Sequence, residues 1–171
     1  MKPLRFLVLL ALLVAFPAWP AQDQLKTIAV LDFGIIDDTG ETAKEAAQQE
    51  RLQMISDQLR RELEEKKLYD VLDNAPAKDL IAEYKSGTYL YQCNGCELVI
   101  ARELGADKVL TAWVQKVSNL ILNINIEIKD VKTGEVTLKK SADIRGNTDQ
   151  SWSRGISYMT RDMVEKGQGG R

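Results

Sequence analysis

The sequence predicts an α/β (α+β) sandwich, with one mixed sheet, a C-terminal antiparallel meander, and a long and a C-terminal helix packed on it. Two patterns indicate this. The compact apolar run KTIAVLDFG (26–34) precedes a long stretch, 42–67, without Gly or Pro, as expected for a strand followed by a helix. In LILNINIEIKDV (120–131), apolar and polar residues alternate, which is typical of a strand with one solvated face.

The first strand is expected over 26–34, and IIDDTGETA is the loop that follows it. Thr42 in this loop is a candidate helix N-cap. The helix after it has apolar residues three or four positions apart, which gives one buried face: Leu52, Ile55, Leu59 and Leu63.

Two short helices follow a second strand, LYDVLDN (68–74). Pro76 suits the first turn of one helix, which Gly87 ends. ELVIARELG (97–105) is the other, and its last residue is a glycine suited to closing a helix.

The second half of the chain predicts a three-stranded meander and a last helix. ADKVLTAWVQKVS (106–118) is the first strand, and Trp113 is assigned to the core. KTGE (132–135) forms the hairpin turn before VTLKKSADI, where Lys140 interrupts the inward series. The last helix has an apolar stripe, and 166–171 is expected to be a flexible tail: Trp152, Ile156, Met159 and Met163 form the stripe.

Residues 1–21 are typical of a secretory signal peptide. Lys2 and Arg5 precede an apolar core, Phe6–Phe16, that is short for a transmembrane helix. An uncleaved N-terminal anchor is the alternative. We therefore expect one periplasmic domain over 22–165, because about 150 residues suffice for one core.

Charge and composition argue against several functions. The chain has 23 basic and 25 acidic residues, and without Lys2 and Arg5 the net charge is about −4. A mildly acidic domain without a basic run is a poor nucleic-acid binder. Histidine is absent, which removes Ser-His-Asp and Cys-His pairs and the commonest transition-metal ligand. We expect neither an enzyme nor a resident metal or cofactor.

Several motifs resemble a known envelope domain. IAVLDF before a long helix, LYDVLD, the GAD that enters a strand and the D-x-x-TG hairpin are similar to the domain shared by the TolB N-terminal region and the curli-secretion lipoproteins. The resemblance covers about residues 26–140 and implies an assembly or partner-binding module without catalysis. The chain has no lipobox cysteine near position 21.

A second resemblance covers most of the mature chain. The C-x-x-C motif, WVQKVSNLILNINIEIKDV and DIRGNTDQSWSRGISYM are similar to a small secreted bacterial family of unknown function. Its members accompany genes for quinoprotein (PQQ-dependent) alcohol oxidation. The resemblance implies a periplasmic accessory protein whose partner is another periplasmic or envelope protein, with the oligomeric state left open.

Cys93 and Cys96, in CNGC, are the two cysteines of the chain. Their position before a helix favours a thiolate, as in thiol–disulfide oxidoreductases. However, no proline follows residue 76, so the cis-proline loop of a thioredoxin is missing. In an oxidising compartment the two cysteines should pair. A structural disulfide is the main interpretation, with a redox pair or half of a metal site as alternatives.

Two polar clusters are candidate ligand or partner surfaces. Asp32, Asp37 and Asp38, with Glu41, follow the first strand, and they are either cation ligands or solvated turn and capping residues. The second cluster lies in RGNTDQSW, where polar residues either cap the last helix or form an interface with residue types common at hot spots: Arg145, Asn147, Asp149 and Trp152.

Three functions follow from these sites. The first is a non-enzymatic accessory protein that binds a partner, in PQQ-dependent alcohol metabolism or envelope assembly. Asn123 and Asn125, on the solvated sheet face, are a further candidate docking surface for it. The second is a thiol-redox helper using Cys93 and Cys96. The third is a small-ligand or cation carrier using the 32–41 loop.

Overall fold

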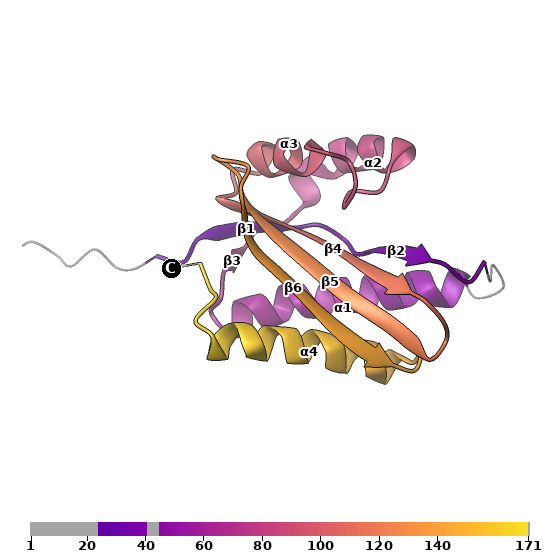
Figure 1. The fold of residues 1–171 in the computed structure, drawn as a ribbon. Coiled ribbons are helices and arrows are strands. Elements are labelled where there is room, and N and C mark those ends of the chain that lie inside the picture. The colour runs from indigo at the N-terminus through magenta and orange to yellow at the C-terminus, as the bar shows by residue number, and fades with distance from the viewer. Residues whose placement is uncertain (1–23, 41–44, 171) are drawn as a thin grey trace, which may run out of the picture.

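The computed structural model describes residues 24–40 and 45–170 (Figure 1). Four helices and six strands follow one another in these segments, with a 3-10 turn before the second helix. Their order is β1 (Thr27–Val30), β2 (Gly34–Asp37), α1 (Glu45–Glu65), β3 (Asp70–Val71), η2 (Ala75–Ala77), α2 (Lys78–Gly87), α3 (Cys96–Glu103), β4 (Lys108–Lys116), β5 (Ile121–Asp130), β6 (Val136–Arg145) and α4 (Asp149–Glu165).

The strands form one mixed sheet in the order β3-β1-β4-β5-β6. β1 pairs in parallel with β3 and β4, and β2 pairs in parallel with a later part of β4. β4, β5 and β6 form an antiparallel meander. The predicted α/β fold is therefore confirmed.

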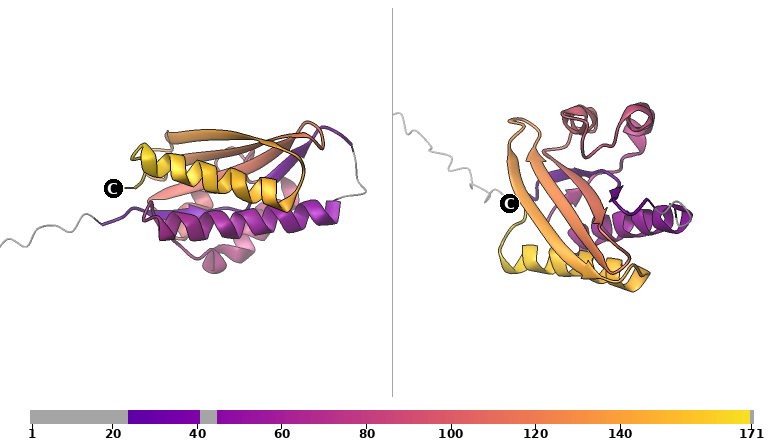
Figure 2. Two further views of the ribbon diagram at one scale, coloured as in Figure 1. Left: turned by 90° about the horizontal axis from the view of Figure 1, so that it is seen from below. Right: turned by 45° about the vertical axis from the view of Figure 1, so that its right-hand side comes forward.

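Helices lie on both sides of the sheet, as the views in Figures 1 and 2 show. α1 and α4 pack on one face, and the predicted apolar residues of both helices lie in the same buried cluster as Leu122, Ile124, Ile126 and Ile128 of β5. α2 and α3 cover the end of the other face near β1, where Ala29, Leu31 and Val109 pack under Ile100. The remaining part of that face is open.

A second strand, β2, covers 34–37, although the sequence predicts one continuous strand over 26–34 and a loop from 35 onwards. The chain leaves the sheet after Val30 and returns at Gly34, which pairs with Trp113. β4 has nine residues, and β1 pairs only with 108–110, so the rest of β4 has an edge available for β2. The second predicted strand, 68–74, is in turn only two residues long, because Leu68 and Tyr69 pack into the core before it begins.

The segment after α4, which the sequence predicts to be a flexible tail, makes backbone hydrogen bonds to the rest of the chain at Gly170. The backbone N–H of Gly170 donates to Leu68 (2.8 Å), and its carbonyl accepts from Lys26 (2.6 Å). A Cβ at residue 170 would lie 2.5 Å from the Tyr69 ring, so a glycine is what permits this close approach. The signal-peptide prediction and those for Glu41 and Thr42 lie outside the described residues. Within the described segments, no helix is both long and apolar enough to cross a membrane.

Candidate functional site

A cleft of about 440 Å³ opens where the parallel strands β1 and β3 end, between α1 and α2. In α/β sheets, ligands commonly bind at the carboxyl ends of the strands. The lining combines an apolar wall with charged and amide groups: Leu31, Leu72, Ala75, Ile81, Leu90, Asp32, Asp57, Arg60, Asp73, Asn74 and Lys78.

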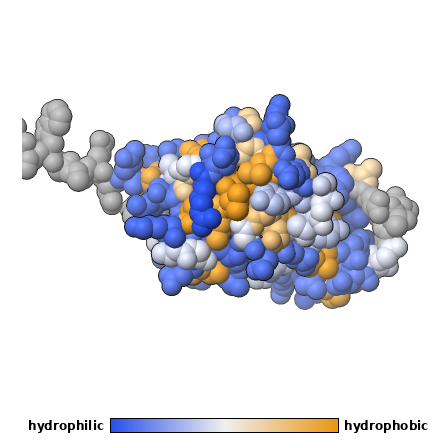
Figure 3. Space-filling view, turned by 90° about the horizontal axis from the view of Figure 1, so that it is seen from above, coloured by the Kyte–Doolittle hydropathy of each residue, from blue (hydrophilic) through white to orange (hydrophobic). Residues whose placement is uncertain are grey.

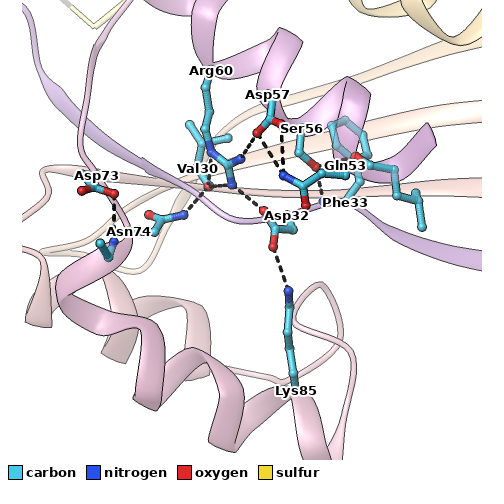
Figure 4. Close-up of polar contacts among 12 residues, drawn as sticks. Val30, Asp32, Phe33, Gln53, Ser56, Asp57, Arg60, Asp73, Asn74 and Lys85 are labelled. Atoms are coloured by element: carbon cyan, nitrogen blue, oxygen red, sulfur yellow. Dashed lines mark hydrogen bonds and ion pairs between the residues drawn. The ribbon is translucent and has the colours of Figure 1, made fainter. Parts of the chain in front are cut away.

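Arg60 of α1 organises the polar side of the cleft (Figure 4). Its Nη2 donates to the carbonyl of Val30 (2.9 Å) and to Asp32 Oδ1 (2.6 Å), and its Nη1 donates to Asp57 (3.0 Å). Asn74 Nδ2 donates to the same carbonyl (2.8 Å), and Asn74 Oδ1 is buried without a partner. Side chains thus satisfy the carbonyl of the last residue in β1, where the chain leaves the sheet.

Asp32 connects this cluster to α2, because Lys85 Nζ donates to its Oδ2 (2.8 Å). Burial alone would raise the pKa of Asp32, but hydrogen bonds from Arg60 and Lys85 outweigh it and lower the pKa. The carboxylate therefore stays ionised between two cationic side chains.

Asp37 and Asp38 lie at the other end of β2 from Asp32. Asp37 is bound by the fully buried Lys116 (2.8 Å) and by Thr39. Burial opposes ionisation, but these hydrogen bonds lower the Asp37 pKa to about 2. Asp38 is exposed and accepts from Gln115 (3.2 Å). The structure thus separates Asp32 from the other two carboxylates of the predicted cluster, and lysine or arginine side chains bind two of the three.

Cys93 and Cys96 form a disulfide with their Cα atoms 5.5 Å apart, and Cys96 is the first residue of α3. Glu97, which the sequence reasoning missed, lies beside it and is only 3% exposed. Its Oε2 is 3.3 Å from Cys93 Sγ, and its Oε1 pairs with Lys129 (2.7 Å). A carboxylate so close disfavours the thiolate that disulfide exchange requires, which favours the structural interpretation of the pair.

The RGNTDQSW segment begins α4, in agreement with the prediction that its polar residues cap the last helix: Thr148 is the N-cap, and its side chain accepts from the backbone N–H of Ser151. Trp152 is fully buried, as the predicted apolar stripe of the last helix requires, and its Nε1 donates to Asn147 Oδ1 (3.0 Å). The alternative that Trp152 is an interface residue does not fit this burial. Asp149 pairs with Arg51 of α1 (2.6 Å). The backbone N–H of Asn147 donates to Asn119 (3.0 Å), which fixes this segment beside the turn between β4 and β5.

That turn, residues 117–121, which we call the hairpin tip, exposes three large apolar side chains. Val117, Leu120 and Ile121 are 52%, 73% and 52% exposed. Ile121 pairs across the sheet with Arg145, which is also exposed. Contiguous exposed apolar groups with a polar rim mark interaction sites. The sequence signal was the run VSNLIL, which also fits an ordinary strand.

The uncovered part of the sheet, which we call the open face, adjoins the hairpin tip. Strand register places six side chains on it in two neighbouring rows: Trp113, Asn125 and Ser141, and Gln115, Asn123 and Asp143. Trp113, predicted to be in the core, is instead partly exposed and stacks on Tyr91 at 5.7 Å between ring centroids. It belongs to the opposite face from the α1–α4 core because strand residues alternate between faces.

The face that carries α2 and α3 has apolar side chains gathered at its centre, with hydrophilic groups around them (Figure 3). Partly buried Ile81 and Leu98 and the 40% exposed Val99 belong to these helices. This patch and the open face lie on the side of the sheet opposite α1 and α4.

The chain folds as a small α/β domain with one mixed sheet, and a similar fold occurs in solved structures of other bacterial proteins. The NMR structure of LpoB from Escherichia coli is similar, with a TM-score of 0.50 and 14% identity over 86% of this chain and 81% of LpoB. The lipoprotein GNA1162 from Neisseria meningitidis gives 0.48 and 16% identity over 84% of this chain and 96% of that one. TolB from Acinetobacter baumannii gives 0.44 and 13% identity over 85% of this chain and 29% of TolB.

The chain itself belongs to the DUF3280 family, described as "Protein of unknown function (DUF2380)", whose sequence profile matches residues 26–164. The expected membership of a family of unknown function is therefore confirmed. No curated protein matches the chain.

Proposed function

We propose that this protein is a non-enzymatic periplasmic accessory protein that binds another envelope protein through the hairpin tip. The observation that carries the proposal is the exposure of Val117, Leu120 and Ile121 on one turn. Exposed apolar side chains of this size gain free energy when a partner covers them, at about 25 cal/mol per Å² of apolar surface buried.

The tip is held in place before any partner arrives. Gly146 donates its backbone N–H to the carbonyl of Leu120 (3.0 Å), and Asn147 donates to that of Asn119 (3.0 Å). Asn147 is in turn fixed by Trp152 and Arg51. A preorganised surface loses less conformational entropy on binding. Arg145 beside the tip adds a residue type enriched at interface hot spots.

Replacing Leu120 with serine tests the proposal. Proteins captured from periplasmic extract by the wild type, and identified by mass spectrometry, should be lost with Leu120→Ser. They should be retained with Val136→Thr, a matched change at another exposed apolar residue, 43% exposed, on β6. Equal capture by both variants, or no specific protein with the wild type, would count against the tip as a docking site.

Quinoprotein-dependent alcohol oxidation is the setting we propose for this partner, on the basis of the sequence resemblance to the secreted family. Deletion of the gene should then slow growth on alcohols. Wild-type protein should restore growth, and Leu120→Ser should not. Normal growth of the deletion strain on all alcohols would exclude a role in alcohol oxidation, and envelope assembly would remain as the proposed role.

The cleft supports binding of a small ligand as a second candidate function. Its volume of about 440 Å³ falls within the range of known ligand sites, roughly 300–1,000 Å³. A ligand that binds only the folded state must raise the melting temperature. Thermal shift with PQQ, Ca²⁺ and lanthanide ions tests this function, and unchanged melting temperatures would exclude these ligands.

A further inference from the structure

The centre of the open face is polar and almost uncharged. Of the six side chains in its two rows, Asp143 alone carries a charge, and the others are a ring, amides and a hydroxyl. On one flank Glu127 pairs with Lys139 (2.6 Å) and Lys129 (3.4 Å), and Lys129 also pairs with Glu97 (2.7 Å). On the other flank, beside Asp143, lies the exposed Arg145. A surface of this composition suits a ligand that is itself uncharged and rich in hydrogen-bonding groups.

Three aromatic rings stack in series at one end of these rows, and the last of them is Trp113. Tyr89 stacks on Tyr91 at 5.4 Å with 23° between the ring planes, and Tyr91 stacks on Trp113 at 5.7 Å with 20°. Tyr89 is 58% exposed. We call these three residues the aromatic row.

Gly34 makes room for the aromatic row. A Cβ at this position would lie 2.3 Å from the Tyr91 ring, so any larger residue would displace the ring. Tyr91 Oη also donates to the carbonyl of Ile35 (3.4 Å). Tyr91, the central ring, is therefore held in place in the free protein, and a ligand need not immobilise it.

The polar side chains beside the row orient one another. Ser141 Oγ donates to Asn123 Oδ1 (2.9 Å), Asn123 Nδ2 donates to Asp143, and Asn125 Nδ2 donates to the carbonyl of Asn123 (3.4 Å). A carboxylate has about four acceptor positions and an amide oxygen has two. Asp143 and Asn125 thus keep acceptor capacity for ligand hydroxyl groups.

We propose that the open face binds a neutral oligosaccharide. A pyranose has an apolar C–H face, which packs on an aromatic ring, and a rim of hydroxyls, which donate to and accept from amide, hydroxyl and carboxylate side chains. The aromatic row and the amide network supply these two components next to each other. The rows contain no cationic side chain that would attract an anionic polymer. This site differs from the hairpin tip and adds a ligand class to the proposed function.

Titration of the exported, purified protein with cellotriose and with N,N′,N″-triacetylchitotriose tests the proposal, read by tryptophan fluorescence and calorimetry. Trp19 lies in the segment expected to be removed on export, and Trp152 is fully buried, so a ligand-dependent change in emission reports Trp113. Binding of at least one of these sugars is expected. Trp113→Ala, and independently Asn125→Ala, should weaken it at least tenfold by calorimetry. Tyr158→Ala, at a 51% exposed tyrosine on α4, should leave it unchanged.

Three results would overturn the inference. One is the absence of heat and fluorescence change with both sugars at millimolar concentration. The second is wild-type affinity in the folded Trp113→Ala and Asn125→Ala variants. The third is equally tight binding of an anionic oligosaccharide such as oligogalacturonate. Leu120→Ser should still bind the sugar and Trp113→Ala should still capture the protein partner, so failure of one proposal is distinguishable from failure of the other.

Discussion

Arg60 holds the point at which the first strand leaves the sheet, through one carbonyl and two carboxylates. A lysine cannot reproduce this planar set of donors, because its charge sits on a single nitrogen. Arg60→Lys should therefore lower the free energy of unfolding by about 1–3 kcal/mol, since the carbonyl of Val30 and Asp32 lose donors. Urea denaturation at neutral pH measures the change.

Arg61→Lys is the matched control, because Arg61 is 60% exposed on the same helix and contacts only Glu65 at 3.9 Å among the ion pairs described. Exposed pairs of this kind contribute roughly 0–1 kcal/mol. Equal destabilisation by the two variants would show that the cluster around Val30 does not stabilise the fold.

Glu62 makes stability depend on pH. Its side chain extends from α1 towards α4 and accepts hydrogen bonds from four donors: Gln58, Lys66, Thr160 and Ser157. Burial opposes its ionised form, but these donors outweigh burial and lower the pKa from 4.5 to about 2. Because the folded pKa is the lower one, the stabilisation is complete above pH 4.5 and is lost as the pH falls towards 2.

Glu62→Gln should destabilise the protein at pH 7, and the difference from wild type should shrink between pH 4.5 and 2. Glu64→Gln, at an exposed position on the same helix, is the matched control and should have nearly the stability of wild type at pH 7. Asp37, whose pKa is also about 2, titrates in the same window, so the stability of Glu62→Gln should depend on pH less steeply than that of wild type but should still fall in acid. A constant difference between Glu62→Gln and wild type would contradict this account.

At the scale of elements, the turn that leads into α3 combines the disulfide with two left-handed residues, Asn94 (φ +51°) and Gly95 (φ +120°). Removing the bond with Cys93→Ser and Cys96→Ser frees a very short loop, for which chain entropy gives about 2 kcal/mol. We expect a lower melting temperature with capture of the protein partner retained. Loss of capture in a folded double variant would instead support the thiol-redox function.

Local sequence patterns correctly predicted those helices and strands whose buried face can be recognised from their own residues. Alternation in β5 identified its buried face, and the spacing of Leu52, Ile55, Leu59 and Leu63 identified that of α1. β2 was missed because it depends on an unpaired part of β4, which lies almost 80 residues away in the sequence, as in Gly34 pairing with Trp113. Glu97 was also missed because its partner is distant in the sequence: it pairs with Lys129 of β5.

The candidate site was predicted only in part for the same reason. The solvated face of β5 was identified from alternation alone. Its extension into a surface requires β4 and β6 in register, which brings Trp113, Asn125 and Ser141 into one row. For Trp152 the sequence left two alternatives, the core stripe and an interface, because its indole finds a partner, Asn147, only when the segment folds back on the β4–β5 turn.

In the whole molecule, helices bury one side of the sheet and only part of the other. Val117, Ile121 and Arg145 have the same strand parity as Trp113 and Asn125, so the hairpin tip and the open face share one side. A protein partner on the tip and an oligosaccharide on the open face would thus be neighbours. This arrangement suits an accessory protein that brings a partner close to a carbohydrate surface.

At the scale of the whole chain, the sequence also predicts export from the cytoplasm. If 1–21 is a signal peptide, protein purified from the periplasm should begin near residue 22 by mass spectrometry. It should contain no free thiol under denaturing conditions, because Cys93 and Cys96 are paired. The same chain produced in the cytoplasm from residue 22 should keep both thiols reduced, since that compartment is reducing. A full-length chain in the membrane fraction would instead identify residues 1–21 as an anchor, and two free thiols in the exported protein would contradict the structural disulfide.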